Sequence, residues 1–300
     1  MFYILRSLFL MATVSVLFAE DEKVLREDIL NDPAFQQVWT YLENKDIPKD
    51  YVINTFLDSG IQIHPKIIAS FNNPYEKKSW EVYRKIFMTD KRLMGGVEFF
   101  KENSKLVMQV SDSMRVDPYL LVSLVGIESN YGRHHGQYTV FNALYTLIHQ
   151  LPRKGKWASR ELAEFIILCH GNKIDPHSIS GSYAGAFGYG QFIPSSFNNY
   201  AIDFDGDSLR HHDKWPDVLG SIANYLLKNG YKPDNDDYSK GSKNWKSVFA
   251  YNRSNNYVGV VMELRQEIKN RIIENLSLIH ISEPTRPERI GGGGGWGGKK

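Results

Sequence analysis

An acidic residue stands at the end of a strongly apolar segment. Residues 120–136 read LLVSLVGIESNYGRHHG, and Glu128 closes the apolar part. A buried carboxyl group without a cationic partner holds its proton more tightly, because desolvation penalises the charged form. A carboxyl that is protonated near neutral pH can act as a general acid. The position is equally compatible with a glutamate in the last turn of a helix that simply reaches water.

A second group of acidic residues has the spacing of metal ligands. In DFDGDSLRHHDKWPD, Asp203, Asp205 and Asp207 occupy positions 1, 3 and 5 of an EF-hand type of loop. Three alternating carboxylates repel one another unless a cation lies between them. Ser208, however, stands at position 6, where such loops use glycine for a sharp turn. The stretch predicts a calcium or sodium site, with an empty acidic loop as the alternative.

Two histidines and an aspartate follow directly, and they raise the question of a transition metal. His211, His212 and Asp213 are the ligand types that such metals take. Adjacent histidines do not lie on one face of a helix, because side chains share a face at spacings of three or four. We therefore favour a hard cation in this loop.

The helix that carries Glu128 has clear sequence boundaries. Asp117-Pro118 combines an N-cap residue with a proline at the first helical position. Gly132 is a plausible C-terminal stop. The pattern predicts a helix over residues 119–129.

This helix is apolar on nearly every side, which predicts a central position in the fold. Glu128 shares a face with Leu121, Leu124 and Val125. Gly126 costs about 1 kcal/mol relative to alanine in a helix interior. We expect it to allow the close approach of a backbone segment or a ligand.

The rest of the body predicts a mainly helical protein. Residues 76–87 are ambiguous and could be extended, and residues 181–192 contain four glycines, which exclude a regular helix throughout. Apolar spacing and capping residues predict helices at 33–44, 48–58, 65–71, 89–103, 105–114, 139–150, 157–169, 194–200, 216–229, 245–250 and 255–273.

Both ends of the chain differ from the body. Residues 1–19 have a basic start, an apolar core and a final small residue, as in a secretory signal peptide, and no cysteine follows for a lipid anchor. A short uncleaved anchor is the alternative. Residues 276–300 follow a compositional break and end in a glycine-rich run. They resemble a translated sequencing adapter, so we expect a non-native or disordered tail.

Composition narrows the function classes. Hydrophobic residues make up 42% of the chain and charged residues 23%, as in an ordinary globular protein. Without the two atypical ends the net charge is close to zero, which argues against nucleic acid as the main partner. Cys169 is the single cysteine, so a disulfide framework is excluded, and its apolar neighbours predict a core residue.

Several long motifs occur in a fixed order along the chain. They are GIESNYG, GSYAGAFGYGQFIPSSFNNYAIDFDGD, SIANYLLKNGY and AYNRSNNYV. Together they resemble the lytic transglycosylases of the membrane-bound B type, glycoside hydrolase family 103, from about residue 33 to residue 270. The resemblance implies a mainly α (α+β) protein with a lysozyme-like fold. The catalytic region would span 20–275, with an additional helical N-terminal part at 20–115 and the lysozyme-like core at 116–275.

The resemblance also implies a reaction. These enzymes cleave the β-1,4 bond between N-acetylmuramic acid and N-acetylglucosamine in peptidoglycan, and they leave a 1,6-anhydro ring. The single catalytic acid would be Glu128. It would protonate the glycosidic oxygen and then take the proton of the muramyl C6 hydroxyl. Most glycosidases use two carboxylates, but an intramolecular hydroxyl has a high effective concentration.

By the same resemblance, further residues would bind the glycan or a metal ion. Taken alone, Ser182 could be a turn hydroxyl, Gln191 a structural amide and the tyrosines packing residues. The metal ligands would be Asp203, Asp205, Asp207, the Leu209 carbonyl and Asp217, around a structural calcium or sodium ion. The substrate-binding residues would be Tyr83, Ser182, Gln191, Tyr225, Tyr251, Asn252 and Tyr257.

The expected protein is thus a monomeric periplasmic enzyme that acts on peptidoglycan glycan strands and requires no cofactor. One alternative is a non-catalytic glycan-binding scaffold, although such proteins commonly lose the acid that Glu128 represents. Another is a lysozyme-type hydrolase, which adds water where a transglycosylase does not.

Overall fold

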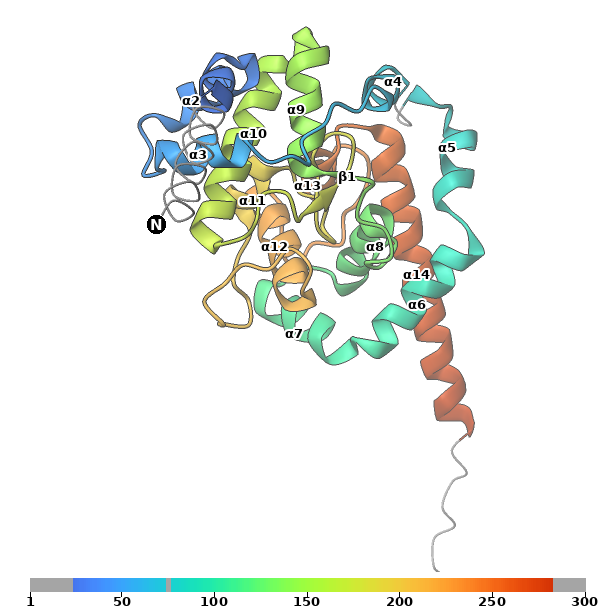
Figure 1. Cartoon of the computed structure of the whole chain (residues 1–300). Helices are drawn as coiled ribbons and strands as arrows, with labels where there is room; N and C mark the ends of the chain where they lie inside the picture. The colour runs from blue at the N-terminus through green and yellow to red at the C-terminus, as the bar shows by residue number, and fades with distance from the viewer. Residues whose placement is uncertain (1–23, 74–76, 283–300) are drawn as a thin grey trace, which may run out of the picture.

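Helices form nearly all of the regular structure in the computed structural model, which describes residues 24–73 and 77–282 (Figure 1). The predicted signal peptide at 1–19 lies outside the described residues. Residues 24–31 are helical. The helices that follow are α2 (Pro33–Leu42), α3 (Lys49–Phe56), α4 (Lys66–Asn72), α5 (Trp80–Phe87), α6 (Asp90–Glu102), α7 (Ser104–Met114), α8 (Pro118–Ser129), α9 (Val140–Gln150), α10 (Pro152–Asn172), α11 (Pro194–Tyr200), α12 (Trp215–Lys228), α13 (Lys243–Tyr251) and α14 (Asn255–Ser282).

The described strands are two short antiparallel pieces, β1 (Tyr138–Thr139) and β2 (Ser180–Gly181). Tyr138 pairs with Gly181 and Thr139 with Ser180. The pairing brings the segment that follows α8 beside the start of the glycine-rich segment. The mainly helical class that the sequence predicts is confirmed.

Three elements depart from the predicted boundaries. The ambiguous residues 76–87 contain a helix, α5, in which Tyr83 is the only buried residue while the apolar Val82 and Ile86 are exposed. Helix α10 begins at Pro152, because proline is favoured at the first helical position even though charged residues follow. Helix α14 continues through Ser282, so the first residues of the 276–300 tail are helical. The remainder of that tail lies outside the described residues.

Helix α8 occupies the centre of the molecule, as its all-round apolar sequence predicts. Residues 120–127 and Ser129 are buried. The helix contacts α6, α7, α12 and α14. Figure 1 shows it between α12 and α14, with α6 and α7 beneath it. Glu128 therefore sits at the end of an element that is fixed on several sides.

The N-terminal helices share one hydrophobic core with the rest of the chain. Helix α2 packs on α9 and α10, and α4 packs on α9. Helices α5 and α6 pack on α14. The N-terminal helices thus pack against α8, which carries Glu128, and against α14.

Among the described residues, no helix combines the length and the apolar character that a bilayer-spanning segment needs.

Candidate active site

Capping at its start fixes the direction of α8. The Asp117 side chain accepts a hydrogen bond from the Leu120 backbone N–H at 2.7 Å. Arg265 of α14 donates to the same carboxylate at 2.5 Å. These contacts confirm the predicted N-cap and tie α8 to α14. Glu128 then falls in the last turn, where it is partly exposed while its helical neighbours are buried.

A buried tyrosine of α14 faces the acid. The Tyr257 hydroxyl donates a hydrogen bond to Glu128 Oε1, and only 2% of Tyr257 is exposed. Burial first, and then the negative charge of Glu128, raise the pKa values of Tyr257 and Tyr251 well above their usual range. Both hydroxyls consequently remain protonated donors over the whole range in which a carboxyl group titrates.

Further predicted tyrosines surround this pair. The Tyr251 hydroxyl donates to the Gly190 carbonyl at 2.5 Å, and its ring centroid lies 4.8 Å from that of Tyr225. The Tyr225 hydroxyl donates to the Ala250 carbonyl at 2.8 Å. Asn252 follows directly as the C-cap residue of α13, with extended backbone. The structure therefore gathers residues from α8, α12, α13 and α14 around Glu128.

Tyr83 is more deeply buried than expected for a residue that lines an open cleft. It is 1% exposed on α5, and its ring centroid lies 4.7 Å from that of Phe87. It is close enough to Tyr257 to contribute to the raised pKa of that phenol. In this structure Tyr83 backs the acid–tyrosine pair.

Ser182 and Gln191 stabilise the glycine-rich segment itself. The Ser182 hydroxyl accepts hydrogen bonds from the backbone N–H groups of Ala184, at 3.2 Å, and Ala186, at 3.1 Å. Gln191 has a positive φ of 49°, and its amide donates to the Gly188 carbonyl at 2.8 Å. Both contacts match the structural alternatives raised from the sequence. Their role in glycan binding remains a prediction.

A cavity of about 510 Å³ opens beside Ser182. Its other lining residues include Lys78, Gln137, Tyr138 and Tyr183. Ser182 thus lines a cavity and also holds its own turn.

The close approach expected at Gly126 involves a side chain. A Cβ atom at Gly126 would lie 2.6 Å from the Tyr131 hydroxyl oxygen. The sequence predicted a backbone segment or a ligand there, and that expectation is wrong, because the chain turns back after α8 and inserts Tyr131 against it. The aromatic residue in ESNYG was the available signal.

The four aspartates of the acidic loop converge. Carboxylate oxygens of Asp203, Asp205, Asp207 and Asp217 all lie within 4.8 Å of one another. Asp217 is fully buried. It accepts the backbone N–H groups of Phe204, at 2.8 Å, and His211, at 2.7 Å. Four converging hard oxygen donors fit a cation such as calcium.

The loop also shows why Ser208 is unusual. Its φ is +72°, a left-handed conformation that glycine adopts at no steric cost. The Leu209 side chain is exposed next to it.

The hydrogen bond from the Leu209 backbone N–H, and then those from Lys214 and His211, lower the pKa of Asp207. Asp207 Oδ2 lies 3.2 Å from Lys214 Nζ and 3.0 Å from His211 Nε2.

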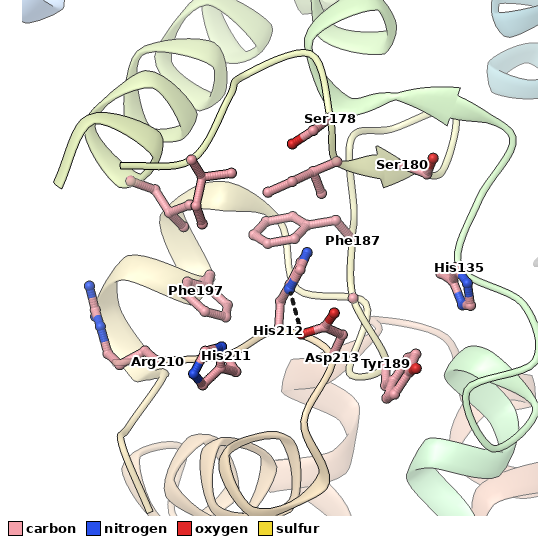
Figure 2. Close-up of a pocket in the computed structure, with 14 residues that line it drawn as sticks. His135, Ser178, Ser180, Phe187, Tyr189, Phe197, Arg210, His211, His212 and Asp213 are labelled. Atoms are coloured by element: carbon pink, nitrogen blue, oxygen red, sulfur yellow. Dashed lines mark ion pairs between the residues drawn. The ribbon is translucent and has the colours of Figure 1, made fainter. Parts of the chain in front are cut away.

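A second cavity, of about 460 Å³, lies beside this loop (Figure 2). Its lining includes Phe187, Arg210 and His212 and excludes Glu128. His212 Nδ1 lies 3.3 Å from Asp213 Oδ1, whereas His211 faces Asp207. The adjacent imidazoles thus face different carboxylates, and a ring nitrogen of His211 also lies within 4.8 Å of carboxylate oxygens of Asp207 and Asp217. The preference for a hard cation over a transition metal stays a prediction.

The acidic loop is joined to the glycine-rich segment. Tyr189 N donates to the His212 carbonyl at 2.9 Å. Gly188 has a φ of +70°, and a Cβ there would lie 2.4 Å from the His212 carbonyl oxygen. The structure therefore places protein backbone directly against this glycine. The carbonyl of the next glycine, Gly190, accepts the Tyr251 hydroxyl, so the loop is linked to the surroundings of Glu128.

Known proteins resemble this chain in sequence and in fold. The domain family described as "Transglycosylase SLT domain" matches residues 31–239. The membrane-bound lytic murein transglycosylase B of Escherichia coli is 37% identical over 155 residues, which cover 51% of this chain. The aligned portion spans only 42% of that relative's length.

Solved structures agree with the sequence relatives. The soluble lytic transglycosylase SltB1 of Pseudomonas aeruginosa superposes with a TM-score of 0.71 and 28% identity, covering 79% of this chain and 98% of that one. An Escherichia coli lytic transglycosylase solved in complex with calcium gives a TM-score of 0.73 and 23% identity, covering 80% and 94%.

Tyr251, Asn252 and Tyr257 lie beyond the matched residues 31–239, yet the fold returns Tyr257 to the acid. The family match, the shared fold and the acid at the end of α8 agree with one another. The chain belongs to the transglycosylase SLT domain family and has the lysozyme-like fold of its lytic transglycosylases.

Proposed function

We propose that this protein is a peptidoglycan lytic transglycosylase. It cleaves the β-1,4 bond between N-acetylmuramic acid and N-acetylglucosamine and leaves 1,6-anhydromuramic acid ends. The observation that carries the proposal is the pairing of Glu128, at the end of a buried helix, with the Tyr257 hydroxyl. Glu128 can give up a proton and take one back, while the Tyr257 hydroxyl remains a hydrogen-bond donor to it throughout.

In the first step, Glu128 donates its proton to the glycosidic oxygen as the bond to C1 breaks. The resulting carboxylate is stabilised by the hydrogen bond from Tyr257, because a donor to an ionised group strengthens as charge develops. Tyr257 does not transfer its own proton, since burial and the nearby carboxylate raise its pKa well above the usual range.

In the second step, the Glu128 carboxylate removes the proton of the muramyl C6 hydroxyl, whose oxygen bonds to C1. The acid is thereby restored, and no water is consumed. A hydroxyl on the same sugar replaces the second carboxylate of ordinary glycosidases, because its effective concentration is high. These two steps require no cofactor.

Replacing Tyr257 with phenylalanine is expected to lower kcat about ten-fold and to change the pH dependence. Without the donor, the ionised acid is less favoured, so Glu128 keeps its proton to higher pH. The alkaline fall in activity should move upward in pH. The measurement is kcat as a function of pH.

Tyr145→Phe is the matched control for this variant. The Tyr145 hydroxyl, on α9, also donates to a carboxylate, that of the α2 N-cap residue Asp32, at 2.7 Å. Its removal should leave the pH profile unchanged. A Tyr257→Phe profile that superimposes on the wild type would exclude the stabilising role of Tyr257.

Solubilisation of purified insoluble peptidoglycan tests whether the protein is an enzyme. The wild-type protein should release soluble fragments that increase with time. A non-catalytic glycan-binding scaffold would instead sediment with the peptidoglycan and release nothing.

The acidic loop is proposed to bind a structural calcium ion. The ligands would be Asp203, Asp205, Asp207, Asp217 and the Leu209 carbonyl. The converging carboxylates support this assignment, and a structural relative was solved with calcium. The ion would neutralise the four acids and hold the loop against the glycine-rich segment, with no part in proton transfer.

Calcium is therefore expected to raise the melting temperature. With a Kd of about 10⁻⁴–10⁻³ M, as in extracellular sites, ten millimolar calcium would add about 1–3 kcal/mol to the free energy of unfolding. Chelator should remove this gain, and Asp205→Ala should abolish the response. Superimposable melting curves in chelator and in calcium would rule out this role.

The location proposed for the enzyme is the periplasm, where its substrate lies. The signal-like composition of residues 1–19 supports export. The partner that the chemistry requires is the glycan strand.

A further inference from the structure

The turn that follows the catalytic helix has an unusual backbone. Asn130, Tyr131 and Gly132 all have positive φ values, of 50°, 59° and 76°. A non-glycine residue in this region is disfavoured by contact between Cβ and the backbone, and a tyrosine more than an asparagine. Such strain persists only where the surrounding structure imposes it, and it gathers at functional sites. Here it begins two residues after Glu128.

Local hydrogen bonds close this turn. Tyr131 N donates to the Val125 carbonyl at 3.1 Å and His134 N to the Ser129 carbonyl at 2.9 Å. The Ser129 hydroxyl donates to the Val125 carbonyl at 3.2 Å and accepts Gly132 N at 3.0 Å. These bonds tie the turn to the last part of α8, on which Glu128 lies.

The Tyr131 side chain fastens the turn to a second helix. Its hydroxyl donates to the Arg92 carbonyl at the start of α6, at 2.8 Å. Its ring centroid lies 5.7 Å from that of Phe99, also on α6. With 7% exposure, the residue is buried between α6 and α8, two helices that both contact α14 (Figure 1).

Two helices have glycine where this ring lies. A Cβ would fall 2.6 Å from the Tyr131 hydroxyl oxygen at Gly126 of α8, and also at Gly96 of α6. At Gly95 it would fall 3.0 Å from the ring. These three glycines form a slot, the glycine slot, that receives the Tyr131 ring. Both helices keep glycine there although glycine stabilises a helix less than alanine does.

We propose that Tyr131 is a positioning residue for Glu128: anchored in the glycine slot between α6 and α8, it holds the strained turn that fixes the last turn of α8. The carboxyl of Glu128 is thereby kept in register with the Tyr257 hydroxyl. The final turn of a helix otherwise frays, because its carbonyls lack partners within the helix. The inference rests on the proposed lytic activity and adds a residue that touches no substrate.

Tyr131→Phe keeps the ring and removes the bond to the Arg92 carbonyl. We expect kcat to fall about ten-fold while KM stays within about two-fold of the wild type. The matched control is Tyr119→Phe, because Tyr119 also joins α8 to α6, through Phe100 at 5.3 Å, but at the opposite end of α8. Its kcat should not change.

Gly95→Ala separates positioning from stability. Alanine favours the helix, but its methyl group presses on the Tyr131 ring. We expect kcat to fall about three-fold or more with no fall in melting temperature. If Tyr131 had a purely structural role, Gly95→Ala would instead lower the melting temperature and leave kcat unchanged.

Wild-type rates from both variants would overturn the positioning role. So would a rise in KM that matches the fall in kcat, because this would indicate glycan binding. A wild-type protein with no lytic activity, measured in parallel, would refute the proposed function instead and remove the basis of the inference.

Discussion

Glu128→Gln is expected to abolish glycan cleavage. The amide has the shape of the acid and can still accept the Tyr257 hydrogen bond, but it has no proton to give to the leaving oxygen. Loss of a general acid costs at least ~10²-fold in rate. In the part of the chain that the structure describes, Glu128 is the carboxyl that accepts the Tyr257 hydroxyl. Initial rates of fragment release from purified peptidoglycan measure the effect.

Folding and glycan binding should survive this substitution. Glu128 is partly exposed and contributes little to the core, so the melting temperature should change only slightly. Co-sedimentation with peptidoglycan should persist. If the variant keeps more than about a hundredth of the wild-type turnover, Glu128 is not the general acid.

Asp217→Ala is expected to have the largest effect on stability. Asp217 is fully buried and accepts two backbone N–H groups, those of Phe204 and His211. Alanine leaves both donors without a partner, at a cost of about 2–4 kcal/mol. For a protein of this size the melting temperature should fall by roughly 4–16 °C, even in chelator.

Asp205→Ala is the matched control in the same loop. Asp205 is exposed, and its carboxylate accepts a hydrogen bond from the Asp207 N–H at 3.3 Å, near the limit for such a bond. In chelator its loss should cost less than about 0.5 kcal/mol, as is usual for a surface position. Equal losses for both variants in chelator would mean that Asp217 does not anchor the loop.

Local signals in the sequence predict much of this structure. Asp117-Pro118 marks the start of α8, and the apolar run after it predicts a central helix. Proline at the first helical position predicts the start of α11 correctly. The spacing of Asp203, Asp205 and Asp207 predicts their convergence. In each case the signal lies within a few residues.

Contacts between distant segments could not be read in this way. Tyr257 meets Glu128 only because α14 packs along α8. Gly188 meets the backbone of His212 because the acidic loop folds over it. Tyr131 fills a slot made by glycines of two helices. Without the family resemblance, local pattern alone would have left Glu128 as a residue in a helical turn.

The mass of the reaction products tests the central claim most directly. Purified peptidoglycan is digested with the wild-type protein, and the released fragments are analysed by mass spectrometry. A lytic transglycosylase joins the C6 oxygen to C1 in an internal acetal, so each new muramic acid end should be lighter by one water, about 18 Da, than the product of a muramidase. Anhydro ends produced by the wild type and missing with Glu128→Gln would support the two-step mechanism in which Glu128 is both acid and base. Hydrated ends would contradict it and identify a lysozyme-type hydrolase.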